Sequence, residues 1–428
     1  MPLAKLTNGG RQLFGSWEWV QTWIMGPRAG KTTCVCVPQI VETGGPVLAT
    51  SNKRDIVDLT RGPRSEKGVV WVHDVQGIIG EPASWWWNPL SFVTSMMRAE
   101  ALTDVFVSSA TQVGAQADAT SSRTASGCSR TCSSPRPSQI GRSRTSPAGC
   151  KTPKTRPGAR AAPGRPQPAA ESLSRIQELT PKQRDGVFGT ARPWVNVLTY
   201  DTVIPWIRDT GQVGRAEFDH RRFASTTDTL FLISKEGAGT ARAITGALTM
   251  AILTDAEEHA ASLTSGRLSP PLMGVLDEVA NVCRWRQLPD VYSHYGSRGI
   301  VLSSFFQGWD QGVEAFGREG MRKLWNASNV RVAGSGLQDA DFLPFLAQVV
   351  GDRTWCAAPR PRRRAGGRSV STSVQRERIL DVSDLAAMPR GRAVLSTSGA
   401  PAALVTLTHY SSKPYGRSVE ASQAHYEP

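Results

Sequence analysis

The sequence lacks any long hydrophobic run. In its 428 residues no stretch reaches the length of about 18 apolar residues that indicates a membrane-spanning helix. The first residues, MPLAKLTNGGRQLFG, contain no hydrophobic signal region either. We therefore expect a cytoplasmic chain that is neither secreted nor embedded in a membrane through a segment of its own.

Paired cysteines and clustered histidines are also missing. The seven cysteines are scattered without a C-x-x-C unit, and the six histidines do not gather. An odd, dispersed set of cysteines argues against a disulfide framework and favours a reducing compartment. We expect Cys34 and Cys36 to pack inside a helix rather than bind a metal, and we expect no transition-metal site.

Acidic residues are absent between Thr120 and Ala170. This segment also has no aromatic residue and a single large apolar residue, Ile140. It carries ten basic residues, whereas the net charge of the whole chain is +14. So few apolar side chains cannot offset the entropy lost on ordering, and disorder is predicted. The ten basic residues are Arg123, Arg130, Arg136, Arg142, Arg144, Lys151, Lys154, Arg156, Arg160 and Arg165.

Two interpretations of this basic segment stay open. It is either an Arg/Ser/Pro-rich arm that gathers nucleic acid by releasing counterions, or the product of a shifted reading frame in GC-rich DNA. The abrupt change of composition at both ends favours the frame shift, as does the length of a structureless stretch inside a domain. If the frame is shifted, most of the positive net charge is not evidence for a nucleic-acid partner.

The stretch MGPRAGKTT, residues 25–33, matches most of a phosphate-binding loop. In the motif G-x-x-x-x-G-K-[ST], backbone N–H groups hold phosphates, the lysine reaches the outer phosphates and the hydroxyl holds Mg²⁺. The second half of the motif is complete, but Met25 stands where the first glycine belongs. The residues expected to bind ATP are Gly26, Pro27, Arg28, Ala29, Gly30, Lys31, Thr32 and Thr33.

The sequence around this loop supports the assignment. SWEWVQTWIM before it has the apolar pattern of a strand, and KTTCVCVPQIVETGG after it is typical of a buried helix that ends at glycines. Pro38 removes an N–H and clashes with the preceding turn, so we expect a kink or a short first segment there. This order places Gly30, Lys31 and Thr32 at a helix N-terminus, which favours an anion. A glycine-rich turn that binds nothing is the alternative.

The second half of the chain alternates strand-like and helix-like segments from Thr226 onward, which predicts an α/β fold with a parallel sheet covered by helices. The apolar strand in LMGVLDE ends in Asp277 and Glu278. Asp277 would hold Mg²⁺ together with Thr32, and Glu278 would orient and deprotonate the attacking water. The next strand, GIVLSSFFQ, ends in Gln307, whose amide either senses the γ-phosphate or is an ordinary strand cap.

The C-terminal part begins after the basic stretch PRPRRRAGGRS. VSDLAAM predicts a short helix, and RAVLSTSGAPAALVTLTHY predicts two strands joined by a Gly–Ala–Pro turn. The last residues, 411–428, are expected to be a disordered tail.

Several blocks, in the same order, resemble the TraG/TraD-type coupling proteins of type IV secretion and conjugation, in particular their actinobacterial branch. Together they cover most of the chain outside residues 120–170. The blocks are GPRAGKTTCVCVPQIVETGGPVLATSNKRDIVDLTRG, WVHDVQGIIGEPASWWWNPLSFVT, LTPKQRDGVFGTARPWV, LDEVANVCRWRQLPDVYSHYGSRGIVLSSFFQ and LWNASNVRVAGSGLQDADFL.

The resemblance implies a RecA-like ATPase motor, usually hexameric, that uses ATP and Mg²⁺. Such a motor docks relaxase-bound single-stranded DNA and relaxosome proteins at the secretion channel, on the cytoplasmic face of the inner membrane. By position, Gly30, Lys31 and Thr32 are similar to Walker A, Asp277 and Glu278 to Walker B, and Gln307 to the sensor glutamine. Residues 281–303 are similar to the segment that reads relaxosome partners, the TraM recognition segment.

The resemblance also implies a division of the chain. Residues 1–95 and 223–410 would form the two halves of the nucleotide-binding core, and residues 96–222 an inserted helical region. Three departures are evident: Met25 in the loop, the lack of the membrane-spanning N-terminus common in the family, and the disrupted insertion. An FtsK-like translocase of duplex DNA, a relic that binds nucleotide or DNA without working as a motor, and a basic nucleic-acid adaptor are the alternatives.

Overall fold

An 11-stranded sheet forms the centre of the computed structural model, in the order β2-β1-β17-β16-β11-β3-β10-β9-β4-β8-β5. The structure describes residues 1–110, 177–235, 239–283, 285–356, 362–364, 367–369 and 374–427, so the segment 120–170, with its two interpretations, lies outside the described residues. The strands of the sheet are β1 (Pro2–Leu6), β2 (Gln12–Phe14), β3 (Gln21–Ile24), β4 (Val47–Ser51), β5 (Val70–Asp74), β8 (Thr229–Ile233), β9 (Leu272–Leu276), β10 (Ile300–Phe306), β11 (Val330–Gly334), β16 (Arg392–Thr397) and β17 (Ala400–Thr406).

The strands from β11 to β5 all pair in parallel, whereas β1, β2, β16 and β17 add antiparallel pairs at one edge. The central strands are buried along their whole length, as parallel strands covered on both faces must be. In β9, Leu272 and Leu276 contribute to one hydrophobic core, and Met273 and Val275 to the other. The expected α/β class with a parallel sheet is confirmed.

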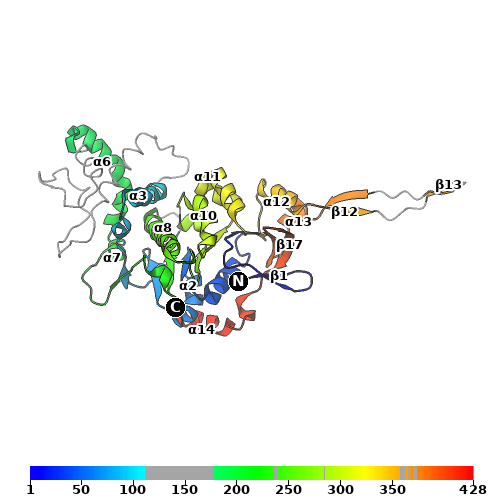
Figure 1. The fold of residues 1–428 in the computed structure, drawn as a ribbon, viewed down its shortest axis with the longest axis horizontal. Coiled ribbons are helices and arrows are strands. Elements are labelled where there is room, and N and C mark those ends of the chain that lie inside the picture. The colour runs from blue at the N-terminus through cyan, green and yellow to red at the C-terminus, as the bar shows by residue number, and fades with distance from the viewer. Residues whose placement is uncertain are drawn as a thin grey trace.

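Helices cover both faces of this sheet (Figure 1). One core includes side chains of α8 (Gly239–Ser262), α10 (Leu288–Ser297) and α11 (Trp309–Ala327). The opposite core includes side chains of α1 (Val37–Glu42) and α2 (Asp55–Ser65). Among the described helices, none is long and apolar enough to cross a membrane.

The helix after the glycine-rich loop starts irregularly, as Pro38 predicts. Residues Thr32–Cys36 form a π-helical turn, and α1 begins at Val37 with Pro38 in its first turn. A proline is tolerated there because the first turn of a helix needs no N–H donor at that position. The strand before the loop is shorter than SWEWVQTWIM suggests, because β3 includes only Gln21–Ile24 and the preceding tryptophans pack against the core from a turn.

The described parts of residues 96–222 are largely helical. They include α3 (Met96–Ala110), α6 (Pro181–Val195) and α7 (Ile204–Ile207). A small parallel pair, β6 (Trp85–Trp86) with β7 (Ala216–Glu217), lies beside them. The division of the chain into core halves and an insertion stays a prediction.

The C-terminal hairpin is present as expected. Strands β16 and β17 pair in antiparallel fashion, and the short helix α13 (Val382–Ala386) precedes them. Between α12 (Phe342–Val350) and α13, two antiparallel pairs project from the body (Figure 1). They are β12 (Asp352–Cys356) with β15 (Val374–Arg378), and β13 (Arg362–Arg364) with β14 (Gly367–Ser369).

The disorder expected for residues 411–428 is wrong. Helix α14 (Gly416–Tyr426) occupies most of that range and packs along α2. Val419 is fully buried between them, in a small core of its own. The prediction failed because it rested on the usual disorder of chain termini, whereas α2 supplies polar partners that the tail sequence does not reveal.

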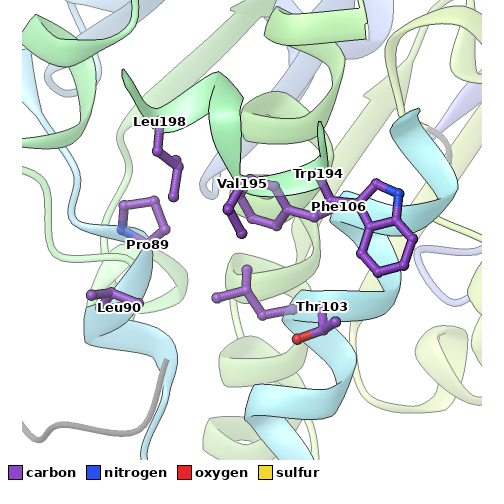
Figure 2. A pocket seen from close by; sticks show the side chains of 8 residues that line it. Pro89, Leu90, Thr103, Phe106, Trp194, Val195 and Leu198 are labelled. Carbon is purple, nitrogen blue, oxygen red and sulfur yellow. The ribbon is translucent and has the colours of Figure 1, made fainter. Parts of the chain in front are cut away.

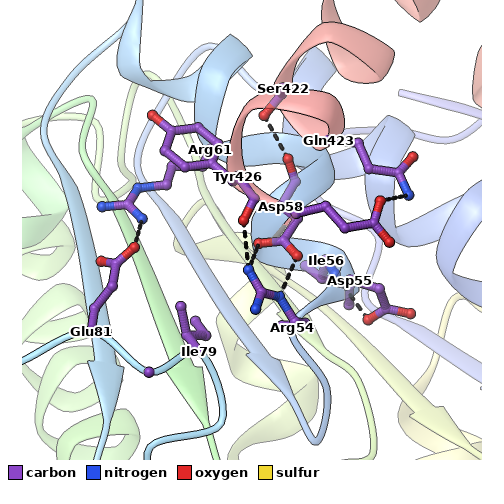
Figure 3. A network of polar contacts seen from close by, with 12 residues as sticks. Arg54, Asp55, Ile56, Asp58, Arg61, Ile79, Glu81, Ser422, Gln423 and Tyr426 are labelled. Carbon is purple, nitrogen blue, oxygen red and sulfur yellow. Dashed lines mark hydrogen bonds and ion pairs between the residues drawn. The ribbon is translucent and has the colours of Figure 1, made fainter.

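Polar contacts hold α14 against α2 (Figure 3). The Ser422 hydroxyl donates to the carbonyl of Asp58 at 2.6 Å and accepts from the Gly62 N–H at 2.9 Å. A Cβ at Gly62 would lie 2.9 Å from the Ser422 Cβ, so the two helices approach as closely as only glycine permits. Arg54 pairs with Asp58 and also donates to the carbonyl of Tyr426 at 2.6 Å. The tail helix is therefore an integral part of the fold.

Replacing Ser422 with alanine is expected to lower the free energy of unfolding by about 1–3 kcal/mol, because it removes the buried hydrogen bond to the Asp58 carbonyl and the part-buried one from the Gly62 N–H. Chemical denaturation of the purified chain measures this loss. Ser418→Ala is the matched control, since its exposed hydroxyl bonds only the carbonyl of Tyr415 in its own helix. Equal stability of the two variants would contradict the docked position of α14.

Candidate nucleotide-binding site

The loop after β3 passes very close to the end of β11. A Cβ at Gly26 would lie 2.3 Å from the carbonyl oxygen of Gly336, so no side chain fits there. Met25, by contrast, is fully buried, and its side chain fills the space beside Gly334. The tight backbone contact that requires glycine therefore falls at Gly26, and Met25 is a packing residue.

The middle of the loop has an unusual backbone. Arg28 and Gly30 have φ values of 59° and 95°. A left-handed arginine costs roughly 1–2 kcal/mol, and such strain is typical of ligand-binding loops. Successive N–H groups in turns of this kind form concavities that bind anions. Pro27 and Arg28 are exposed, Ala29 is buried, and Thr32 and Thr33 are partly buried at the start of the helix.

The two acidic residues predicted at the end of β9 are both buried next to the loop. Asp277 and Glu278 are 6% and 4% exposed. Lys31 Nζ lies 3.3 Å from Glu278 Oε1, which makes a buried ion pair between the loop and the end of β9. Glu278 has left-handed backbone angles, φ 53° and ψ 41°, a strained conformation that is common at functional sites.

Three amide groups complete the surroundings of Glu278. Gln307, at the end of β10, donates to Glu278 Oε1 at 2.6 Å. Gln311 and Asn281 donate to Glu278 Oε2 at 3.2 Å and 3.4 Å. With Lys31, four donors from four parts of the chain fix this carboxylate. In the sheet, β10 lies between β3 and β9, and this order brings Lys31, Glu278 and Gln307 together.

Sequence reasoning missed Gln311 and Asn281. Gln311 is the third residue of α11, after Gly308 at the N-cap. A glutamine at this position reaches back toward the helix start in capping boxes, and that pattern was visible in the sequence. Asn281 lies in the short helix α9 (Val279–Val282) and has no comparable signal.

The Asp277 side chain has the character of a ligand for a hard cation. Its Oδ1 is buried and has no hydrogen-bond partner among the described residues. Burial raises the pKa of this carboxyl to about 7; the Lys31 ammonium opposes the rise, and the Glu278 carboxylate adds to it. A buried oxygen without a partner fits Mg²⁺, which prefers carboxylate ligands and water. Of the described residues, no group of three or more His, Cys, Asp and Glu could hold a metal by themselves.

Asp277→Asn is expected to stabilise the metal-free protein at pH 8 by about 4 kcal/mol and to change little near pH 4. The Asp277 pKa is about 7 in the folded chain and about 4 in the unfolded chain. The folded state therefore retains the proton longer, so the wild type loses stability as the pH rises from about 4 to 7. Urea unfolding of both proteins with a chelator tests this, and a difference independent of pH would contradict it.

A separate pocket lies away from these residues, between α3, α6 and the 3-10 turn Pro89–Phe92 (Figure 2). Its side-chain polar groups are the Trp194 indole N–H and the Thr103 hydroxyl, which donates to the carbonyl of Ala99 at 2.8 Å. An apolar pocket with no charged side chain offers nothing for phosphate. It is lined by Pro89, Leu90, Leu102, Thr103, Phe106, Trp194, Val195 and Leu198.

Residues 271–390 match the family model described as the TraM recognition site of TraD and TraG. This range contains Asp277, Glu278, Gln307 and Gln311, together with α10 and α11. No protein in the curated set matches the chain.

Solved structures share the fold over nearly the whole chain. The bacterial conjugative coupling protein TrwBdeltaN70, in an unbound form, has 13% identity and a TM-score of 0.65, with 95% of this chain and 88% of that chain covered. Plasmid coupling protein TrwB in complex with ADP and Mg²⁺ has 13% identity and a TM-score of 0.50, with 87% and 86% covered. VirB4 of Thermoanaerobacter pseudethanolicus has 12% identity and a TM-score of 0.55, with 97% and 98% covered.

These structures show that the chain has a RecA-like α/β fold. The family match adds a likeness in sequence over residues 271–390, which is detected independently of the fold. The chain is therefore similar to the TraG/TraD-type conjugative coupling proteins in two respects, the segment that the family model matches and the shared fold.

Proposed function

We propose that the chain is an ATP-driven motor that docks relaxase-bound DNA at a type IV secretion channel and helps to move it through. The observation that carries this proposal is the constellation of the buried Lys31 and Glu278 with the partly buried Gln307, at the carboxyl ends of β3, β9 and β10. Ligands of open α/β sheets bind at this edge. The complex of TrwB with ADP and Mg²⁺ supports the choice of nucleotide.

Each residue of the constellation has a distinct part in hydrolysis. Lys31 would exchange its contact with Glu278 for the outer phosphates, while N–H groups of residues 26–33 hold the inner ones. Glu278, released from the ammonium, would accept a proton from the attacking water. Gln307, which donates to Glu278, would sense the γ-phosphate. Mg²⁺, held by Thr32 and Asp277, would neutralise charge that develops on the phosphates.

The proposed protein partners rest on the match to the family model. Residues 271–390 resemble a segment named for its recognition of TraM, which supports relaxosome proteins as partners of the surface around α10 and α11. We further propose a homo-hexamer at the cytoplasmic face of the inner membrane, with single-stranded, relaxase-linked DNA as the cargo.

The test is ATP hydrolysis by the full chain, with Mg²⁺ and equal masses of single-stranded and duplex DNA of one sequence. Several-fold stimulation by the single strand supports the proposal. Stronger stimulation by duplex would favour an FtsK-like translocase instead. Nucleotide binding without hydrolysis under any condition would identify a relic, and would overturn the proposed motor.

A further inference from the structure

The side-chain amide of Gln311 bonds two groups of the candidate site, the backbone N–H of Gln307 and the carboxylate of Glu278. Its Oε1 accepts from the backbone N–H of Gln307 at 2.8 Å, and its Nε2 donates to Glu278 Oε2 at 3.2 Å. The orientation of the amide is determined by these partners, because an N–H needs an acceptor and a carboxylate needs a donor. One side chain therefore ties the end of β10 to the end of β9.

The two tied groups also touch each other. Gln307 donates to the other oxygen of the same carboxylate, Glu278 Oε1. Glu278, Gln307 and Gln311 thus form a closed ring of hydrogen bonds in which the carboxylate receives one amide on each oxygen. Networks of this kind hold side chains in one arrangement when every member is satisfied.

We propose that Gln311 is a positioning residue for ATP hydrolysis, which holds Glu278 and Gln307 in the arrangement needed to activate water. The inference rests on the proposed function of this site. Gln311 has no hydrogen bond or ion pair with residues 26–33 among the contacts of the described chain, so its effect is on turnover rather than on nucleotide affinity. Because it is carried by the first turn of α11, the position of that helix determines whether the ring can close.

A simpler role for Gln311 is helix capping. A glutamine or glutamate in this position bonds a backbone N–H before the helix, and the two residue types serve equally well. A pure cap therefore tolerates Gln311→Glu. A positioning residue does not, because glutamate keeps the acceptor for Gln307 but loses the donor for Glu278 and places a second carboxylate beside it.

The experiment compares Gln311→Glu and Gln311→Leu with the wild type. We expect both variants to lower kcat about 10- to 100-fold, as small misplacements of reacting groups do, with the Kd for a fluorescent ATP analogue changed less than about threefold. Asp310→Asn, an exposed change in the same helix turn, controls for effects on the helix start. Near-normal kcat in Gln311→Glu would overturn the proposal and favour a helix cap. A loss of nucleotide affinity as large as the loss of kcat would also overturn it, because Gln311 would then act on binding.

A second readout does not depend on turnover. Hydrogen exchange at the Gln307 amide should stay slow in the wild type and in Gln311→Glu, and become faster in Gln311→Leu, which has no acceptor. Unchanged protection in Gln311→Leu would show that the contact is absent and would overturn the inference. If the wild type hydrolyses no ATP but the protection pattern is as expected, the proposed function fails while the positioning contact stands.

Discussion

Lys31→Ala is expected to reduce ATP hydrolysis at least about 100-fold and to weaken nucleotide binding. The side chain is 9% exposed and is aimed at the end of β9, where it meets Glu278. In the loop motif the lysine ammonium reaches the outer phosphates, and charges that stabilise a transition state in a buried site are worth several kcal/mol. Steady-state hydrolysis and titration of a fluorescent ATP analogue measure the two effects.

The variant should still fold. Removing Lys31 leaves Glu278 without its buried counter-ion, which costs stability, but the three amide donors of Gln307, Gln311 and Asn281 remain. Lys5→Ala, an exposed lysine on β1, is the matched control and should hydrolyse ATP like the wild type. Equal turnover in Lys31→Ala and Lys5→Ala would refute the assignment of the phosphate-binding loop.

Glu278→Gln is expected to reduce kcat at least about 100-fold while nucleotide binding is retained. The change removes the group that would accept a proton from water, and general bases contribute about 10²- to 10⁴-fold. It also creates a conflict, because the new N–H₂ group faces donors in either orientation of the amide. These are Gln311 and Asn281 on the Oε2 side, and Gln307 and Lys31 on the Oε1 side. Single-turnover hydrolysis and nucleotide titration separate the two quantities.

The control for this substitution is Glu319→Gln, an exposed glutamate on α11. It removes the same charge from the chain and should leave kcat unchanged. A Glu278→Gln protein that hydrolyses ATP normally would require another base. One that loses nucleotide binding in parallel would point to a collapsed site rather than a missing base.

Local patterns predicted much of the site. The loop motif contains Lys31, and an apolar run that ends in two carboxylates contains Asp277 and Glu278. Both signals are short and depend on neighbours in sequence, so a reader of the sequence can find them. The bonds that Gln307 and Gln311 make to Glu278 depend instead on which strands lie side by side. Asn281 was missed for another reason, because its short helix carries no sequence signal.

The ends of the chain illustrate the same limit. The hairpin of β16 and β17 was visible as two strands around a turn, but its pairing with β1 from the other end of the chain was not. The helical tail was mistaken for a disordered one, since its binding surface on α2 lies far away in sequence.

The sequence by itself determined the α/β class and the positions of the candidate phosphate-binding loop and of the carboxylate pair, because hydrophobic period and motif spacing are properties of short segments. Only the tertiary structure decided that β10 separates β3 from β9, that four donors surround Glu278, and that α14 belongs to the fold. These features arise from contacts between segments distant in the chain, and their free energy comes from burial and hydrogen bonds that exist only once the segments have met.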